Sequence, residues 1–186
     1  MKLLPLLLAS FLVAIPLQAK QIAGIEMPES VELDGMSLNL SGAGIRTKMF
    51  MDIYAGGLYL NSPGGSAADI VAADQNMAIR LHIVSGLVSS EAMEEATREG
   101  FQNATGGNTD PISDSVEKFI AVFKDPIVEG DVFEIFYKSG SGVLVYKNGK
   151  YRDTVAGGMP FKQAVFSIWL GDKPADKKLK KGMLKR

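Results

Sequence analysis

Residues 131–155 read DVFEIFYKSGSGVLVYKNGKYRDTV, and this stretch decides the fold class. β-branched and aromatic residues dominate three short runs within it. Such runs predict strands, here over 131–137, 143–146 and 151–155. The Asn148-Gly149 pair between the last two runs favours a tight hairpin, because both residues tolerate a positive φ angle. The stretch therefore predicts an antiparallel meander.

Four runs upstream of the meander predict further strands. They span 30–33, 36–40, 50–60 and 77–84. The last run alternates strictly between apolar and less apolar residues, so this strand has one strongly apolar face. Gly56 and Gly57 lie inside the third run, where they indicate a bulge or the close approach of another part of the chain.

Helical spacing of apolar residues appears in five other segments. One begins at Ser89 or Ser90 and includes Phe101; the others span 66–73, 113–124, 160–170 and 174–184. Strands thus come first, followed by helices, the meander and more helices. This order predicts an α+β domain with one large antiparallel sheet and helices packed on one side.

The composition of the 186-residue chain excludes several kinds of site. It contains no cysteine, which excludes disulfides, thiolate metal sites and cysteine nucleophiles. His82 is the only histidine, so a multi-histidine metal site is impossible and a hydrolase triad would need that residue. The formal net charge of −1 gives no general attraction to nucleic acid. We therefore expect no metal, no cofactor and no nucleic-acid partner.

One basic cluster lies near the C-terminal end of the sequence. It contains Lys177, Lys178, Lys180, Lys181, Lys185 and Arg186. Cations are favourable near the C-terminus of a helix. We expect a solvated helix end, and a surface-binding patch is the alternative.

The first nineteen residues have the layout of a secretory signal peptide. Lys2 gives a positive head, the run 3–15 is almost entirely apolar, and Ala19 is a small residue before Lys20. The run is shorter than the ~20 residues of a membrane span, although an uncleaved anchor is the alternative. We expect cleavage near Ala19, one domain over residues 20–186, no membrane span and a place outside the cytoplasm.

Three segments occur in a familiar order: SGAGIR at 41–46, DIYAGGLYL at 52–60 and FSIWLGD at 166–172. Together they resemble the chalcone-isomerase-like family, most closely its exported bacterial branch, over nearly the whole mature chain. The resemblance implies an open-faced sandwich, in which a large antiparallel sheet is covered on one side by a layer of helices. The bacterial branch also implies the periplasm as the location.

The same resemblance implies a site. The family includes plant enzymes that close chalcones into flavanones and non-catalytic members that bind fatty acids, and both use a cleft between sheet and helices. An arginine that faces this cleft matches Arg46. Tyr54 matches a threonine of the enzymes and is more similar to the fatty-acid-binding members, in which arginine and tyrosine hold a carboxylate.

Other enzyme residues do not carry over by the resemblance. Near the positions of an enzyme tyrosine and asparagine, this chain has Ser89 and Ala96. The late serine or threonine of the enzymes falls near Ser167 or Ile168. Plant-type isomerase residues are thus only partly present.

Arg46 is also a candidate from its chemistry alone. Gly42 and Gly44 precede it and let the backbone approach another group closely. A guanidinium binds a carboxylate through two parallel hydrogen bonds, and in an apolar cleft it needs an anionic partner. The alternative partner is internal, a salt bridge to Asp52. Tyr54 either donates to the same ligand or is a core tyrosine with a satisfied hydroxyl.

Three hypotheses for the function follow. The first is a non-catalytic, exported protein that binds an apolar or aromatic acid, such as a fatty acid, with Arg46 and Tyr54 on the head group. The second is an isomerase or intramolecular lyase for an unsaturated aromatic ketone, in which Arg46 stabilises a developing oxyanion. The third is a structural or interaction protein of the cell envelope with a collapsed cleft and an internally paired Arg46.

Overall fold

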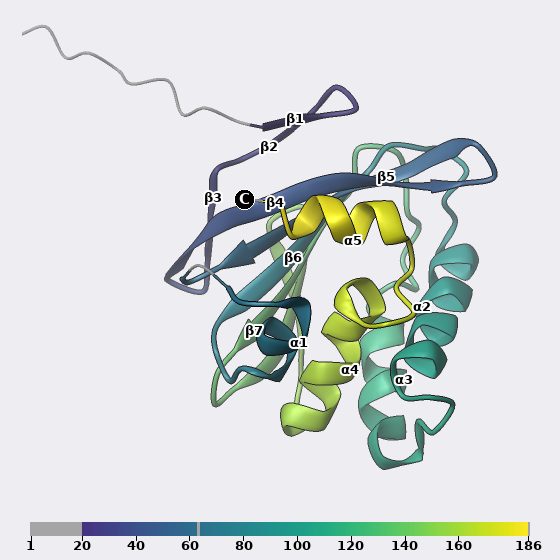
Figure 1. The fold of residues 1–186 in the computed structure, drawn as a ribbon. Helices are drawn as coiled ribbons and strands as arrows, with labels where there is room; N and C mark the ends of the chain where they lie inside the picture. Colours follow the sequence, from purple (N-terminus) through teal and green to yellow (C-terminus); the bar gives the residue numbers. More distant parts are fainter. Residues whose placement is uncertain (1–19, 63, 186) are drawn as a thin grey trace, which may run out of the picture.

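A computed structural model of the protein describes residues 20–62 and 64–185, so the expected signal peptide and Arg186 lie outside the described residues. Within them the chain forms a seven-stranded antiparallel sheet whose strands follow one another in sequence order (Figure 1). The strands are β3 (Ser30–Leu33), β4 (Met36–Lys48), β5 (Met51–Leu60), β6 (Met77–Ile83), β7 (Val132–Lys138), β8 (Gly142–Lys147) and β9 (Lys150–Val155).

The remaining elements are helices and one small hairpin. The helices are α1 (Ala67–Ala72), α2 (Ser90–Ala104), α3 (Ser113–Ala121), α4 (Gly158–Leu170) and α5 (Lys177–Met183), with a 3-10 turn at Asp110–Ile112. The hairpin consists of β1 (Lys20–Ile22) and β2 (Ile25–Met27). Figure 1 shows the helices gathered on one side of the sheet. The predicted α+β class and the helical layer on one side are confirmed.

The main core lies between the sheet and the helices, because the alternating strands turn their apolar faces to α2, α3 and α4. At its centre the rings of Phe101, Phe119 and Phe161 pack with centroids 5.8–6.0 Å apart. These rings come from the three helices, so they join the helices to one another as well as to the sheet.

A second, smaller core lies on the opposite face of the sheet and was not predicted. Its buried members are Met27, Val31, Leu33, Leu38, Ala43, Ala55, Tyr59, Ala78, Phe136 and Leu144. They come from β2, β3 and β4 as well as from the middle strands, so the sheet curls and one end covers its own outer face. The turn between β3 and β4 is tied down there, since Lys138 Nζ lies 2.6 Å from a carboxylate oxygen of Asp34.

Two boundaries differ from the sequence prediction. The strand expected over 36–40 continues as β4 to Lys48, because the glycine-rich segment pairs with β5 despite its low strand propensity. The last helix begins at Lys177 instead of Pro174, because the Asp176 carboxylate accepts hydrogen bonds from the amides of Lys178 and Leu179 at 2.7 and 2.8 Å. The β1–β2 hairpin carries no strong turn or alternation signal and was missed.

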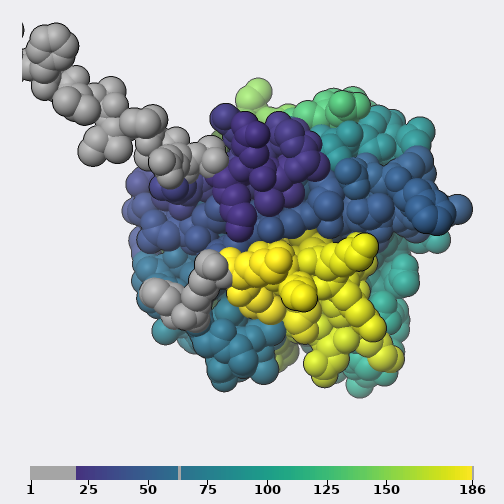
Figure 2. All heavy atoms as spheres, turned by 45° about the horizontal axis from the view of Figure 1, so that its top comes forward, coloured from purple at the N-terminus to yellow at the C-terminus, as the bar shows by residue number. Residues whose placement is uncertain are grey.

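Helix α5 lies directly against β4. In Figure 2 the yellow atoms of the C-terminal segment lie beside the blue atoms of the β4–β5 segment. Glycines make this contact possible. A Cβ atom at Gly42 would lie 2.7 Å from the carbonyl oxygen of Met183, and one at Gly182 would lie 2.7 Å from that of Ala43. The backbone at Gly42 and Gly44 was expected to approach another group closely, and that group is helix α5. There is no bulge at the Gly56-Gly57 pair, where side chains of α5 and β2 fill the space instead.

Substitution of Gly42 by alanine tests this contact. The added methyl group must push α5 away from β4, so we expect a loss of about 1–3 kcal/mol in the free energy of unfolding, as in other overpacked cores. Urea unfolding of Gly42→Ala measures it. Gly86→Ala is the matched control, because the nearest atom to its Cβ is 3.8 Å away. Equal stability of the two variants would contradict the packing argument.

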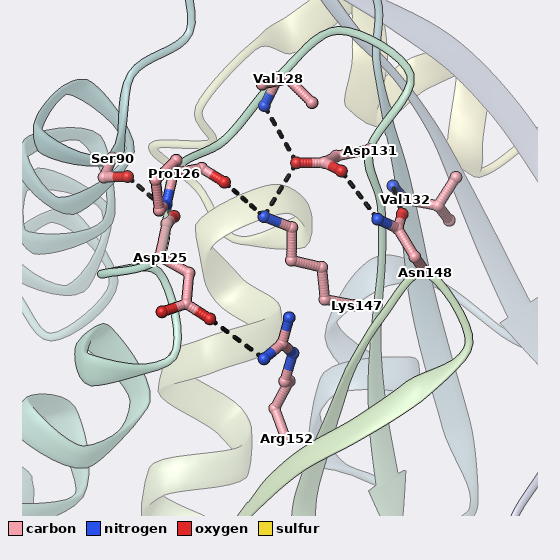
Figure 3. Close-up of polar contacts among 9 residues, drawn as sticks. All are labelled: Ser90, Asp125, Pro126, Val128, Asp131, Val132, Lys147, Asn148 and Arg152. Atoms are coloured by element: carbon pink, nitrogen blue, oxygen red, sulfur yellow. Dashed lines mark hydrogen bonds and ion pairs between the residues drawn. The ribbon is translucent and has the colours of Figure 1, made fainter.

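A buried ion pair fixes the loop before β7 to the β8–β9 hairpin (Figure 3). Lys147 Nζ lies 2.9 Å from an Asp131 carboxylate oxygen, and both side chains are only 7% exposed. Lys147 also donates to the carbonyl oxygen of Pro126 at 2.6 Å. Asp131 accepts further hydrogen bonds from the amide of Val128 and the side chain of Asn148. Each buried charge is thus both paired and hydrogen-bonded.

Burial alone would raise the pKa of Asp131, but hydrogen bonds from Asn148 and Lys147 outweigh it and hold the pKa below its usual value. A carboxyl group whose pKa is lower in the folded state stabilises the fold at pH values above its unfolded-state pKa. This stabilisation is lost as the pH falls through the folded-state pKa.

Lys147→Met should therefore destabilise the protein in a pH-dependent way. At pH 7 it leaves a buried carboxylate without its cation, at a cost of about 3–5 kcal/mol. The cost should shrink in acid, where Asp131 of the variant becomes protonated. Urea unfolding of the wild type and the variant, at pH 7 and at an acidic pH, measures how the destabilisation changes. Lys138→Met is the control, because its ion pair with Asp34 is over a third exposed and contributes less than about 1 kcal/mol. A pH-independent loss in Lys147→Met would contradict the assignment.

Candidate functional site

An apolar pocket of about 190 Å³ lies between the β4–β5 hairpin and the start of α2. Its lining residues are Arg46, Lys48, Met49, Met51, Ile53, Leu87, Val88, Ala92, Met93 and Ala96. Its only ionisable lining residues are the two cations. A larger, more open hollow of about 750 Å³ lies among α1, α2 and α4, but Arg46 does not border it. The pocket is therefore the candidate site, and it contains the arginine that the sequence indicated.

Arg46 lies on the face of β4 that is turned to the helices, in register with Tyr54 of β5. Its guanidinium carbon is 5.5 Å from the centroid of the Tyr54 ring, within range of a cation–π interaction. The side chain is half-buried, and no carboxylate of the described residues lies within ion-pair distance of it. Asp52, the alternative partner, accepts a hydrogen bond from the Thr47 hydroxyl at 3.0 Å instead.

Tyr54 lies beneath Arg46 and is almost completely buried. Its hydroxyl oxygen accepts a hydrogen bond from Trp169 Nε1 at 2.9 Å. Burial raises the pKa of Tyr54, although Arg46 and Trp169 act in the opposite direction, so the phenol is neutral and keeps its proton.

The surroundings of this hydroxyl leave its proton without an acceptor. Indole and guanidinium groups only donate hydrogen bonds, so neither Trp169 nor Arg46 can accept from Tyr54. No other described residue accepts a hydrogen bond from it. The Arg46 guanidinium borders the apolar pocket, and the Tyr54 hydroxyl is a second donor that is buried behind it and does not line the pocket. An acceptor that carries negative charge matches the guanidinium.

Trp169 was not assigned a role from the sequence. It is the only tryptophan of the chain and lies in the FSIWLGD segment that carries part of the family resemblance. Its pairing with Tyr54 joins α4 to β5 across 115 positions in sequence. Apart from its rarity and that segment, no local pattern could have identified this contact.

The other positions compared with the enzymes supply no polar group to the pocket. The Ser89 hydroxyl accepts a hydrogen bond from the amide of Ala92 at 3.2 Å and caps α2. Ala96 borders the pocket with a methyl group. Ser167 borders the larger hollow instead, and Ile168 is buried in the main core. Arg46 is therefore the one enzyme-like polar residue in the pocket lining.

His82 and Lys162 are the other residues whose chemistry could indicate a site. His82 lies on the opposite face of the sheet from Arg46, and burial together with the Arg80 charge lowers its pKa. Lys162 is fully buried in α4, and burial lowers its pKa to about 8. Its Nζ donates to three carbonyl oxygens at the end of α1, at 2.7–3.0 Å. The three N–H groups of the charged form match these acceptors, which makes Lys162 a structural cap.

Two further searches cover only the part of the chain that the structure describes. There, no group of three His, Asp or Glu side chains is arranged to hold a metal ion. No described helix is long and apolar enough to cross a membrane.

The fold and the pocket define a class of protein, an open-faced sandwich with an arginine between its sheet and helices. The family model described as chalcone isomerase-like matches residues 19–185, and the chain belongs to that family. A fatty-acid binding protein of Arabidopsis thaliana has the same fold, with a TM-score of 0.63 and 21% identity, over 84% of this chain and 96% of that chain. The expected sandwich is thereby confirmed. A search of the curated proteins finds no match.

Tyr54→Phe tests the buried hydrogen bond. The variant leaves the Trp169 N–H unsatisfied in the core, so we expect a loss of about 1–3 kcal/mol in unfolding free energy. Urea unfolding followed by the fluorescence of the single tryptophan measures it. Tyr151→Phe removes an exposed hydroxyl that bonds Thr154 and should change stability by less than about 0.5 kcal/mol. A Tyr54→Phe protein as stable as this control would argue against the hydrogen bond.

Proposed function

We propose that this protein is a non-catalytic binder of an apolar carboxylate, such as a fatty acid, and that it works in the periplasm after removal of residues 1–19. The observation that supports the binding role best is the Arg46 guanidinium, which borders an apolar pocket without a carboxylate partner among the described residues. The Tyr54 hydroxyl, buried behind it, is the second donor. The export part is supported only by the sequence of the first nineteen residues.

A carboxylate satisfies both donors at once. It has two oxygens and accepts up to four hydrogen bonds, so one group can take two from the guanidinium and one from the phenol. Within the pocket Ile53, Val88 and Met93 supply apolar surface for the remainder of the ligand. The charge of Arg46 is then balanced by the ligand, as a cation in a mostly apolar site requires.

The pocket volume constrains the ligand. At about 190 Å³ it is smaller than the ~300–1,000 Å³ of typical small-molecule sites. A short-chain or small aromatic acid therefore fits inside, whereas a long acyl chain would extend past Met49, Met51 and Leu87 at the surface. The Arabidopsis protein of the same fold is described as a fatty-acid binding protein, which supports a ligand of this class.

Catalysis is the alternative, and the pocket favours it less. An isomerase needs Arg46 to stabilise a developing oxyanion and needs further polar groups to bind and orient the substrate. Ala92 and Ala96 stand where the α2 wall could carry such groups. A purely structural role requires an internally paired Arg46, and its guanidinium has no carboxylate partner among the described residues.

Native mass spectrometry with extraction of bound small molecules tests the proposal. The chain is expressed with its first nineteen residues, and its intact mass is expected to correspond to a start at Lys20. We expect an apolar acid to co-purify with the wild type. Arg46→Ala should weaken binding roughly 10–100-fold, the range for charge-assisted hydrogen bonds. Ala96→Phe should also abolish binding, because the ring fills the pocket while the arginine is retained.

Arg152→Ala is the matched control, since this arginine pairs with the exposed side chain of Asp125 and neither residue lines the pocket. Its binding should equal that of the wild type. Identical ligand content in Arg46→Ala and Arg152→Ala would sink the proposed head-group site. Turnover of a chalcone-type ketone that depends on Arg46, with no acid bound, would establish the isomerase instead.

A further inference from the structure

The tip of the β4–β5 hairpin is the most exposed apolar feature among the described residues. Phe50 is fully exposed, at 103%, and Met49 is 79% exposed. Met51 and Leu87, at 43% and 70%, lie beside it. Figure 2 shows the blue β4–β5 segment projecting beyond the rest of the surface at one side. Met49, Met51 and Leu87 also line the Arg46 pocket, so the tip forms one side of the pocket mouth.

The backbone of this tip is unfavourable for the residues it carries. Met49 and Phe50 form the two-residue turn between Lys48 and Met51, and their φ angles are +49° and +66°. Turns of this kind prefer Asn-Gly, because other side chains are strained at positive φ. The same chain uses Asn148-Gly149 in the β8–β9 turn, at φ of +53° and +71°. Folding alone therefore gives no reason for methionine and phenylalanine at the β4–β5 turn.

The shape and charge of the tip identify its partner. A standard protein–protein interface buries roughly 800 Å² on each partner, more than a narrow hairpin tip can supply. A lipid surface needs only a few apolar side chains that enter the acyl boundary, with cations beside them at the head groups. Lys48 directly precedes the turn and Arg46 lies behind it. Asp52, on the other arm of the hairpin, accepts a hydrogen bond from the Thr47 hydroxyl, and no carboxylate lines the pocket.

We propose that the β4–β5 tip inserts into a lipid membrane surface with Phe50 as its anchor, so that the pocket mouth opens toward the acyl chains. This inference rests on the proposed binding of an apolar acid. It deepens that function, because the ligand then passes between membrane and pocket without crossing water. Phe50 itself does not line the pocket, so membrane contact and ligand affinity can be separated by mutation.

Phe50→Gly is the decisive variant. It removes the anchor and replaces a strained residue by one that accepts positive φ, so its melting temperature should equal or exceed that of the wild type. Co-sedimentation with vesicles of phosphatidylcholine and phosphatidylglycerol should show that the variant binds about tenfold more weakly than the wild type. This is the loss expected when the burial of one phenylalanine side chain in the membrane is removed. Tyr151→Ser, an exposed aromatic four strands away in the sheet, should bind like the wild type.

Phe50→Trp provides the converse test. The variant should bind the vesicles at least as well as the wild type, and its added tryptophan emission should shift to shorter wavelength when vesicles are present. The native Trp169 is buried and should show no such shift in the wild-type protein.

A second measurement separates this inference from the proposed function. Displacement of a fluorescent fatty acid in vesicle-free buffer should give the same affinity for wild type and Phe50→Gly, while transfer of that acid from vesicles should be slower in the variant. Vesicle binding that depends on Phe50 in a protein that binds no acid would refute the proposed function and leave the membrane contact standing. Three results would overturn the membrane inference. The wild-type protein does not bind vesicles, the Phe50→Gly variant binds them as well as the wild type, or the tip mediates self-association instead.

Discussion

The backbone contact between α5 and β4 is the constraint on which the site depends. Gly42 and Gly44 leave one face of β4 without side chains, and the helix occupies that space. Arg46 is the next residue on the same face, and it emerges where the helix begins. Asp176 marks this point, because its carboxylate caps α5 and also accepts from the amide of Thr47 at 3.3 Å. Helix α5 thus covers β4 at its glycines and leaves the strand uncovered at Arg46.

Two buried lysines of the same chain have a structural role, and both have their hydrogen-bond acceptors within the protein. Lys162 donates to three carbonyl oxygens, and Lys147 has both a carboxylate and a carbonyl oxygen. Buried charges without such partners are costly. Arg46 is half-buried, yet no carboxylate of the described residues lies within ion-pair distance, and its guanidinium contacts Tyr54 instead. This contrast within one molecule supports the proposal that the arginine binds an external anion.

Much of the fold could be predicted from the sequence, because alternating strands and amphipathic helices are local patterns. The 77–84 run and the Asn148-Gly149 turn were reliable for this reason. The glycine-rich half of β4 was missed, since its strand conformation comes from pairing with β5 and from α5, both distant in sequence. Likewise, Arg46 was marked by its residue type and family resemblance. Trp169 was not, because its role exists only once α4 lies beneath β5.

The walls of the pocket are held from both sides, which limits how a ligand enters. The Ser90 hydroxyl at the start of α2 donates to the carbonyl oxygen of Asp125 at 2.9 Å, in the loop that the Lys147 ion pair fixes. The loop before α2 is held to β5 by a hydrogen bond of 3.0 Å from the Val84 amide to the Ile53 carbonyl oxygen.

Movement of α2 as a whole would break these bonds and is therefore a costly route. Met49 and Met51 form the remaining side of the pocket, and methionine is the most adaptable of the apolar side chains. Exchange of a ligand can then proceed by rotation of these two side chains at the exposed mouth. The fixed part of the pocket holds the charged donor, and the adaptable part lies where the apolar tail of the proposed ligand would pass.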